Sequence, residues 1–260
     1  MKPHIKDVSP ARFTGFLADL LEGRVMPARK IGPSSYSNTG YIPSSKGPRI
    51  QRAESMLEQE FLTLLDYDSR VEGFQSQPFT IRWKDSKGRW RDYTPDVVVT
   101  YTTAAMAADR SLKTTVVELK LRAELKVKWE ELRPKLRAGV SWAKLYGCRF
   151  SIVTDKEVRT PYLVNVQHLT HYRSIRLGEH PKAGRFQRKL LGALQEVQID
   201  TPRGLLTRLS SDPVDQGELL PWLWNLVTQN LIGVDLTLPL TMASPIWLTE
   251  KGASVLRIMQ

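Results

Sequence analysis

Short apolar runs and alternating segments mark four parts of the chain as strands. Residues 79–83 (FTIRW) alternate between apolar and polar side chains. The runs VVVTY at 97–101 and TTVVELKL at 114–121 are β-branched and mostly apolar, and RFSIVT at 149–154 completes the set. The run at 97–101 is typical of a strand that is buried on both faces of a sheet.

Helical periodicity occupies the stretches between these strands. The helix predicted over residues 51–68 carries its apolar side chains on one face, at Leu57, Phe61, Leu64 and Leu65. Residues 123–146 predict a long charged helix, which Pro134 is expected to kink or interrupt. A strand, a helix and a strand in this order predict a parallel strand pair joined by a crossover. The pattern therefore predicts an α/β fold with a mixed sheet flanked by helices.

The pattern changes after Pro161 and becomes mainly helical. Helices are predicted over residues 183–198, 201–210 and 216–229, and two short strands over 231–240 and 245–248. Helices followed by a small hairpin are the signature of a winged helix. We therefore expect a mainly α, winged-helix-like C-terminal domain over residues 161–260, after a first folded domain over residues 51–160.

Residues 1–50 predict a basic N-terminal arm. One short amphipathic helix is expected within Ala11–Glu22, followed by a stretch rich in Pro, Ser, Gly and Tyr that favours extended or turn backbone. Two interpretations stay open for this arm. It is either a flexible terminus without a binding role or a basic segment that lies along DNA and becomes ordered on binding.

The charge of the chain points to a polyanionic partner. Its 260 residues carry a net charge of +11, which indicates nucleic acid or an acidic membrane surface. The excess is uneven: residues 1–52 carry +6 and residues 201–260 carry −1. The last segment is therefore not expected to bind phosphates strongly.

Other features of the composition limit the kinds of site and the cellular location that we expect. The single cysteine, Cys148, excludes an intrachain disulfide and a zinc site built from cysteines. No apolar run approaches the roughly 20 residues that a membrane span needs. The first residues do not resemble a signal peptide. We expect a bacterial cytoplasmic protein with no membrane partner.

Four residues carry the candidate chemistry: Glu58, Asp96, Glu118 and Lys120. Asp96 opens the strand at 97–101, and Glu118 and Lys120 share one face of the next strand. Charges within a buried strand are costly unless they are compensated. A divalent cation between Asp96 and Glu118 would compensate them, and the backbone carbonyl of Leu119 adds a further oxygen ligand. Lys120 would then orient the attacking water and balance charge in the transition state.

Each part of this set has a simpler interpretation. Glu118 and Lys120 would also fit an exposed ion pair on an edge strand. Glu58 would complete the metal shell from its helix, but Ser55 and Glu58 also match the S-x-x-E capping box, which alone explains a glutamate there. Both roles of Glu58 cannot be fully served at once.

The arrangement resembles the PD…ExK site of restriction-type nucleases, and the segments around it resemble the TnsA family. These segments are S-x-L-E-x-x-F-L-x-L-L at 55–65, Q-x-Q-P-F at 75–79, Y-T-P-D-V-V-V at 93–99, V-E-L-K at 117–120 and V-T-D-K-E-V at 153–158. They occur in the family's order over about residues 50–160.

The resemblance implies a restriction-endonuclease-like fold and a defined activity. TnsA is the endonuclease subunit of a heteromeric transposase and cuts double-stranded DNA at the 5′ ends of the transposon. A TnsB-type transposase cuts and joins the 3′ ends, and a TnsC-type ATP-dependent regulator selects the target. By position, Glu58, Asp96, Glu118 and Lys120 match the family's catalytic residues, although Glu118 falls where some members carry Gln. The resemblance also implies Mg²⁺ or Mn²⁺, as two ions.

Two other functions fit the same sequence. One is a non-catalytic DNA-bridging adaptor on a nuclease-like scaffold, and the other is a stand-alone restriction or repair nuclease. The presence of all four candidate residues favours an enzyme over the adaptor. The basic arm and the non-basic tail favour a subunit of a complex, whose tail contacts a protein such as the regulator or the partner transposase.

Overall fold

The computed structural model describes residues 8–28, 40–47, 50–173, 175 and 182–259. They form two compact units, which divide between Val158 and Arg159. No helix among the described residues is both long and apolar enough to cross a membrane. Most of the Pro- and Ser-rich stretch of the predicted arm, at 29–39, lies outside the described residues.

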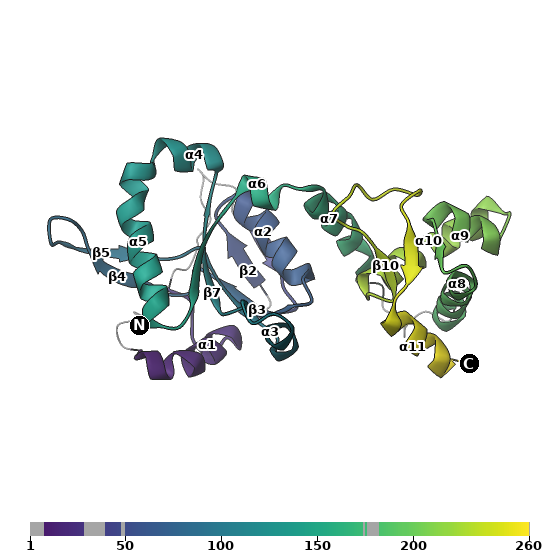
Figure 1. Cartoon of the computed structure of the whole chain (residues 1–260), viewed down its shortest axis with the longest axis horizontal. Coiled ribbons are helices and arrows are strands. Elements are labelled where there is room, and N and C mark those ends of the chain that lie inside the picture. Colours follow the sequence, from purple (N-terminus) through teal and green to yellow (C-terminus); the bar gives the residue numbers. More distant parts are fainter. Residues whose placement is uncertain (1–7, 29–39, 48–49, 174, 176–181, 260) are drawn as a thin grey trace. The chain divides into compact units, whose positions relative to one another are not determined.

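A four-stranded mixed sheet forms the centre of the first unit (Figure 1). Its spatial order is β3 (Val71–Ser76), β6 (Val97–Tyr101), β7 (Thr115–Lys120) and β8 (Arg149–Thr154). β3 and β6, and β6 and β7, pair antiparallel, whereas β7 and β8 pair parallel. The mixed sheet and the parallel pair predicted from the crossover are confirmed, and the arrangement fits a nuclease-like fold.

The two central strands owe their position to apolar, β-branched side chains. Val97, Val98 and Val99 of β6 and Val116 and Val117 of β7 are all almost fully buried. Such residues fill both faces of a covered sheet. Because β7 lies between β6 and β8, the interpretation of Glu118 and Lys120 as an ion pair on an edge strand is wrong.

Smaller elements surround this sheet. Two hairpins pair β1 (Gly40–Pro43) with β2 (Ile50–Ala53) and β4 (Ile81–Lys84) with β5 (Trp90–Tyr93). The helices are η2 (Pro10–Arg12), α1 (Phe13–Leu21), α2 (Met56–Tyr67), α3 (Thr103–Ala108), α4 (Arg122–Val127), α5 (Trp129–Leu145) and α6 (Asp155–Val158).

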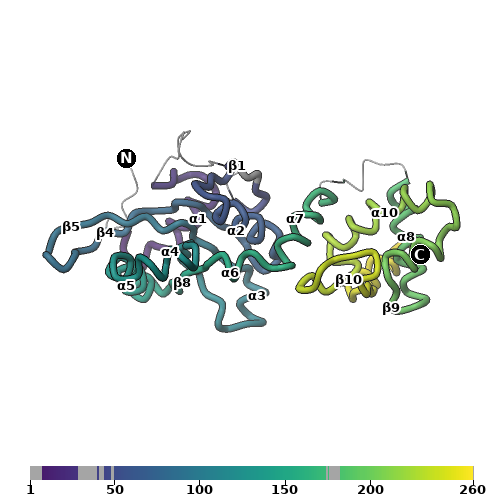
Figure 2. Tube along the Cα trace, turned by 90° about the horizontal axis from the view of Figure 1, so that it is seen from above, coloured from purple at the N-terminus to yellow at the C-terminus, as the bar shows by residue number. Residues whose placement is uncertain are grey.

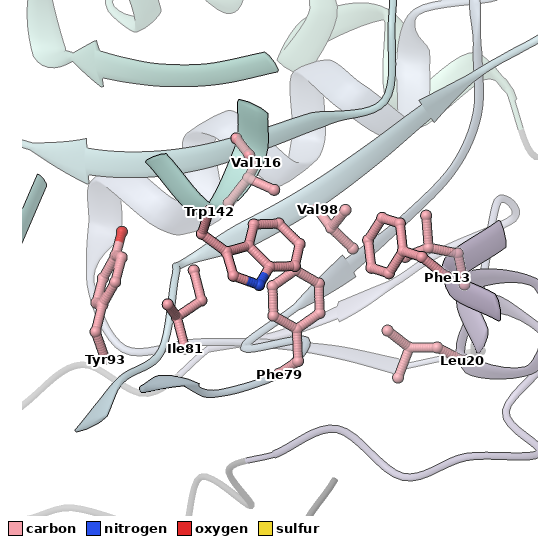
Figure 3. Packing of buried hydrophobic residues seen from close by; sticks show 10 residues of the cluster. Phe13, Leu20, Phe79, Ile81, Tyr93, Val98, Val116 and Trp142 are labelled. Atoms are coloured by element: carbon pink, nitrogen blue, oxygen red, sulfur yellow. The ribbon is translucent and has the colours of Figure 1, made fainter. Parts of the chain in front are cut away.

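Helix α1 is part of the core of the first unit. Its Phe13 is buried, with its ring 5.3 Å from that of Trp142 and 5.9 Å from that of Phe79. Figure 3 shows these three rings packed together, next to the sheet residues Val98 and Val116. Residues 13–21 of the predicted arm are thus a packed helix, because burial of its apolar face holds α1 against the core.

The long helix predicted over residues 123–146 is two helices. The interruption lies at Lys128, between α4 and α5, and α5 continues through Pro134. Gly139 lets α5 approach the sheet, since a Cβ there would lie 2.5 Å from the Phe150 ring of β8. The expected helix over residues 51–68 also starts later, at Met56, because Ser55 is extended and caps it.

The second unit combines five helices with a small antiparallel sheet among its described residues. The helices are α7 (Pro161–Arg173), α8 (Ala183–Val197), α9 (Pro202–Leu209), α10 (Pro213–Thr228) and α11 (Glu250–Met259). The sheet has the order β10 (Ile232–Val234), β11 (Ile246–Leu248) and β9 (Ile199–Asp200). The predicted helix and hairpin pattern is present, with α7, β9 and α11 in addition, and the winged-helix assignment stays a prediction.

Two buried amides hold the irregular segments of this unit. Asn165 of α7 donates to the carbonyls of Leu236 and Leu238, at 2.8 and 2.7 Å, and accepts from the N–H of Leu240 at 3.0 Å. Asn225 of α10 donates to the carbonyl of Tyr172 at 2.7 Å. Each amide supplies partners to backbone groups that have no strand neighbour.

Candidate active site

The Lys120 ammonium lies among three oxygen atoms at one end of β7. Its Nζ is 2.8 Å from the carbonyl oxygen of Leu119, 3.1 Å from Glu118 Oε1 and 3.9 Å from Asp96 Oδ2. Asp96 precedes β6, and its own N–H donates to the carbonyl of Val117 on β7. The pairing of β6 with β7 therefore brings both carboxylates to one cation.

Asp96 is held by the backbone of the neighbouring strand. Its Oδ2 accepts the N–H of Leu119 at 2.7 Å. Burial, and next the negative charge of Glu118, raise the pKa of Asp96 to about 7. The raised pKa means that the ionised form of Asp96 is disfavoured next to Glu118. A further positive charge at this place would stabilise that form.

Glu118 is almost fully buried, and both of its oxygens have partners. The Tyr93 hydroxyl donates to Oε2 at 2.6 Å, and the Lys135 ammonium of α5 lies 2.7 Å from Oε1. The same ammonium lies 4.9 Å from the centre of the Tyr93 ring. Tyr93 and Lys135 thus clamp the Glu118 side chain in one orientation.

The charges of this cluster set its protonation. Burial alone would raise the pKa of Glu118, but Lys120 and then Lys135 more than offset it, so the pKa lies below its ordinary value. Burial lowers the pKa of Lys120, but Asp96 and Glu118 together raise it above its ordinary value. Burial and then Glu118 keep the pKa of Tyr93 well above its usual range. Glu118 is therefore an anion and Lys120 a cation at neutral pH.

Glu58 is turned toward the start of its own helix. Its carboxylate accepts the N–H of Glu54 at 2.8 Å and the Ser55 hydroxyl at 3.1 Å, and Ser55 Oγ accepts the N–H of Glu58 at 3.2 Å. Burial raises the pKa of Glu58, whereas the hydrogen bonds from Glu54 and Ser55 and the positive charge of Lys120 act to lower it. The Ser55 half of the predicted capping box is present, whereas Glu58 accepts the N–H of Glu54 in place of that of Ser55. A metal-binding role for Glu58 stays a prediction.

The oxygens around Lys120 fit a divalent cation. Two carboxylates and a backbone carbonyl converge on one positive charge, and these are the donors that Mg²⁺ and Mn²⁺ take. Within the described ranges, no three His, Cys, Asp or Glu side chains gather as a metal site by themselves.

The sequence prediction placed Asp96, Glu118, Leu119 and Lys120 together, and the structure brings them together. It missed Tyr93 and Lys135. Tyr93 has a weak signal in the sequence, since it lies on a strand three residues before Asp96. Lys135 has none, because its contact with Glu118 depends on how α5 packs over the sheet.

Two family models match the chain, one in each unit. The model of the TnsA-like endonuclease N-terminal domain matches residues 68–155, and that of the TnsA endonuclease C-terminal domain matches residues 157–236. The chain belongs to the TnsA family. Asp96, Glu118 and Lys120 lie within the first match, whereas Glu58 lies before it. A comparison with curated proteins found no match.

Membership of the TnsA family has consequences for activity. TnsA endonuclease domains imply nuclease activity in an assembly of the Tn7 transposase type that acts on DNA. The oxygen cluster around Lys120 lies in the unit that the N-terminal endonuclease model matches. This cluster is therefore the candidate active site of the family's nuclease activity.

Proposed function

We propose that this chain hydrolyses DNA strands at the 5′ ends of a transposon in a reaction that depends on Mg²⁺ or Mn²⁺. The observation that carries the proposal is the convergence of Asp96, Glu118 and the Leu119 carbonyl on one cation. Lys135 already pairs with the buried Glu118, yet oxygens of Asp96, Glu118 and Leu119 all lie within 4 Å of the Lys120 ammonium as well. Two carboxylates and a carbonyl match the ligand demand of a hard divalent ion.

The metal is held by Asp96, Glu118 and the Leu119 carbonyl in this proposal. When bound, it supplies Lewis acid chemistry, which polarises the phosphate and makes a water more acidic. The Leu119 N–H and the clamp of Tyr93 and Lys135 keep the two carboxylates in place before DNA arrives. Such preorganisation is where much of a nuclease's rate enhancement arises.

Lys120 acts as a cation in this proposal. In the metal-free site the charges of Asp96 and Glu118 raise its pKa above the ordinary value. Lys120 therefore donates hydrogen bonds and balances the negative charge that develops on the scissile phosphate. Glu58 is proposed as a further ligand after it leaves its capping interactions, and a second ion, which the family resemblance implies, would involve this residue.

The partners follow from the family. We propose that a TnsB-type transposase cuts and joins the 3′ ends and that a TnsC-type ATP-dependent regulator selects the target. Residues 201–260 carry a net charge of −1, which argues against strong phosphate contacts there. The second unit is proposed to contact a partner protein. Tight, steeply salt-dependent binding of residues 161–260 alone to duplex DNA would overturn this assignment.

The experiment is a strand-nicking assay on a transposon-end duplex with Mg²⁺, with and without the partner transposase. Asp96→Ala and Lys120→Ala are expected to reduce 5′-end cleavage by at least roughly a hundredfold, because each removes a charge from the site. Circular dichroism checks that the variants stay folded. Wild-type rates in either folded variant would refute the site, and cleavage without any partner protein would favour a stand-alone nuclease.

A further inference from the structure

The β4–β5 hairpin has its base in the core of the first unit and its strands in solvent. Both views show it extending away from the four-stranded sheet (Figures 1 and 2). Ile81 and Tyr93 form the pair at its base, and both are buried. From Arg82 to Asp92 every side chain except those of Trp83 and Asp85 is exposed. The candidate active site makes no use of these exposed residues.

The exposed part of the hairpin is strongly basic. Five cations face two acids between residues 82 and 92. Asp85 already accepts Arg89 and Arg91, each at 3.1 Å, in the turn that closes the hairpin. Across the described part of the chain, no acid lies within ion-pair distance of Arg82, Lys84 or Lys87. These three cations are available to a partner.

An exposed tryptophan lies between two of these cations. Trp90 is 56% exposed, and its ring centre is 4.9 Å from the Arg82 guanidinium carbon and 5.0 Å from Lys84 Nζ. Lys84 pairs directly with Trp90 across the hairpin, and Arg82 pairs with Asp92, so alternation places these four side chains on one face. This basic aromatic face combines charges for phosphates with a flat ring for sugars or bases.

The base of the hairpin is joined to the candidate active site. Tyr93 ends β5 and donates to Glu118, and Asp96 follows three residues later. Lys87 at the turn is six residues from Tyr93, which is about 20 Å of extended chain. A duplex rises about 3.4 Å per base pair. The hairpin therefore has the length to follow DNA for about six base pairs from a phosphate held at the candidate active site.

We propose that the β4–β5 hairpin binds duplex DNA beside the scissile phosphate, with Arg82, Lys84 and Lys87 on phosphates and Trp90 against the sugars. The proposal rests on the proposed endonuclease function and names the element that holds its substrate. A two-stranded ribbon has the width to enter the major groove. Free cations beside an exposed aromatic ring favour DNA over an acidic protein surface, which would also neutralise the charges but has no need of Trp90.

The test measures binding of the full chain to a fluorescein-labelled 30-base-pair duplex by fluorescence anisotropy, in EDTA, at several salt concentrations. The Arg82→Gln, Lys84→Gln double variant is expected to weaken binding by roughly ten- to a hundredfold at 0.1 M salt, and to make the slope of log K against log salt shallower by about 2. Trp90→Ala is expected to weaken binding severalfold with the slope unchanged.

The matched control is the Arg110→Gln, Lys113→Gln double variant. It removes the same charge from exposed residues at the opposite end of β7 from Lys120 and is expected to leave the slope at the wild-type value. An equal change of slope in both double variants would overturn the proposal, because it would show a general charge effect. Wild-type DNA binding in the hairpin variant, with loss of binding to the partner transposase, would overturn it in favour of a protein contact.

The outcome is separable from that of the proposed function. Binding in EDTA involves no cleavage, so a hairpin that binds DNA in a chain that never cleaves would refute the endonuclease and keep the hairpin proposal. If the wild-type enzyme cleaves DNA but the Arg82→Gln, Lys84→Gln variant keeps the wild-type salt slope, the hairpin proposal is refuted and the endonuclease proposal is kept. Circular dichroism spectra of all variants exclude misfolding, which is not expected because the changed side chains are exposed.

Discussion

Both units of the molecule bury neutral amides, but among the described residues the buried acidic side chains, Glu58 and Glu118, lie in the first unit. In the second unit the amides of Asn165 and Asn225 are buried and neutral. Backbone groups satisfy Asn165, and the Tyr172 carbonyl and the Gln229 side chain satisfy Asn225. In the first unit the carboxylates of Asp96 and Glu118 lie with the ammonium groups of Lys120 and Lys135 at one end of a strand. A satisfied amide stabilises a fold at little cost, whereas a cluster of largely buried ionisable groups is costly and is kept where chemistry needs it.

The sharpest way to break this comparison is to remove a buried amide. Asn165→Ala leaves the carbonyls of Leu236 and Leu238 and the N–H of Leu240 without this partner. We expect a loss of about 2–4 kcal/mol in the free energy of unfolding of the second unit, measured by urea denaturation. Thr237→Ala, at an exposed position in the same segment, is the control and should cost less. A change below about 0.5 kcal/mol for Asn165→Ala would contradict a stabilising role for the amide.

The clamp on Glu118 provides the next largest effect. Lys135→Met removes the ammonium 2.7 Å from Glu118 while keeping the length of the side chain. We expect cleavage to fall by roughly ten- to a hundredfold at saturating Mn²⁺, because outer partners orient metal ligands. Lys144→Met, on the same helix and exposed, is the matched control and should cleave at the wild-type rate. Equal rates for the two variants would show that the clamp does not position Glu118.

Much of the first unit was predictable because its signals are local. The runs of β6, β7 and β8 predicted strands, and the i, i+2 spacing predicted that Glu118 and Lys120 would share a face. β3 was not delimited, because its sequence VEGFQS mixes a glycine and polar residues into a strand whose burial comes from its neighbours. Helix α7 was missed because it has almost no amphipathic periodicity.

The parts that escaped prediction depend on tertiary packing. The burial of Phe13 of α1 among Trp142 and Phe79 joins segments that are distant in sequence. The contact of Lys135 with Glu118 arises because the crossover folds α5 over β7, and no local pattern encodes that angle. The sequence could not decide whether the Glu58 side chain caps its helix or faces the other candidate residues. In this structure its carboxylate makes hydrogen bonds at the start of its own helix.

The central claim is that Asp96, Glu118 and the Leu119 carbonyl form a cation site, and thermal melting with and without Mn²⁺ between pH 5.5 and 8 tests it most directly. The pKa of about 7 for Asp96 lies above its unfolded value of 3.8, so the folded state holds a proton that the unfolded state has lost. Stability of the metal-free protein should therefore fall as the pH rises through this window.

Mn²⁺ should raise the melting temperature by several degrees at pH 8 and less at pH 5.5, since it competes with that proton. Asp96→Asn should abolish both effects. A wild-type melting temperature that does not respond to Mn²⁺ at pH 8, or an equal rise in the Asp96→Asn variant, would contradict the account.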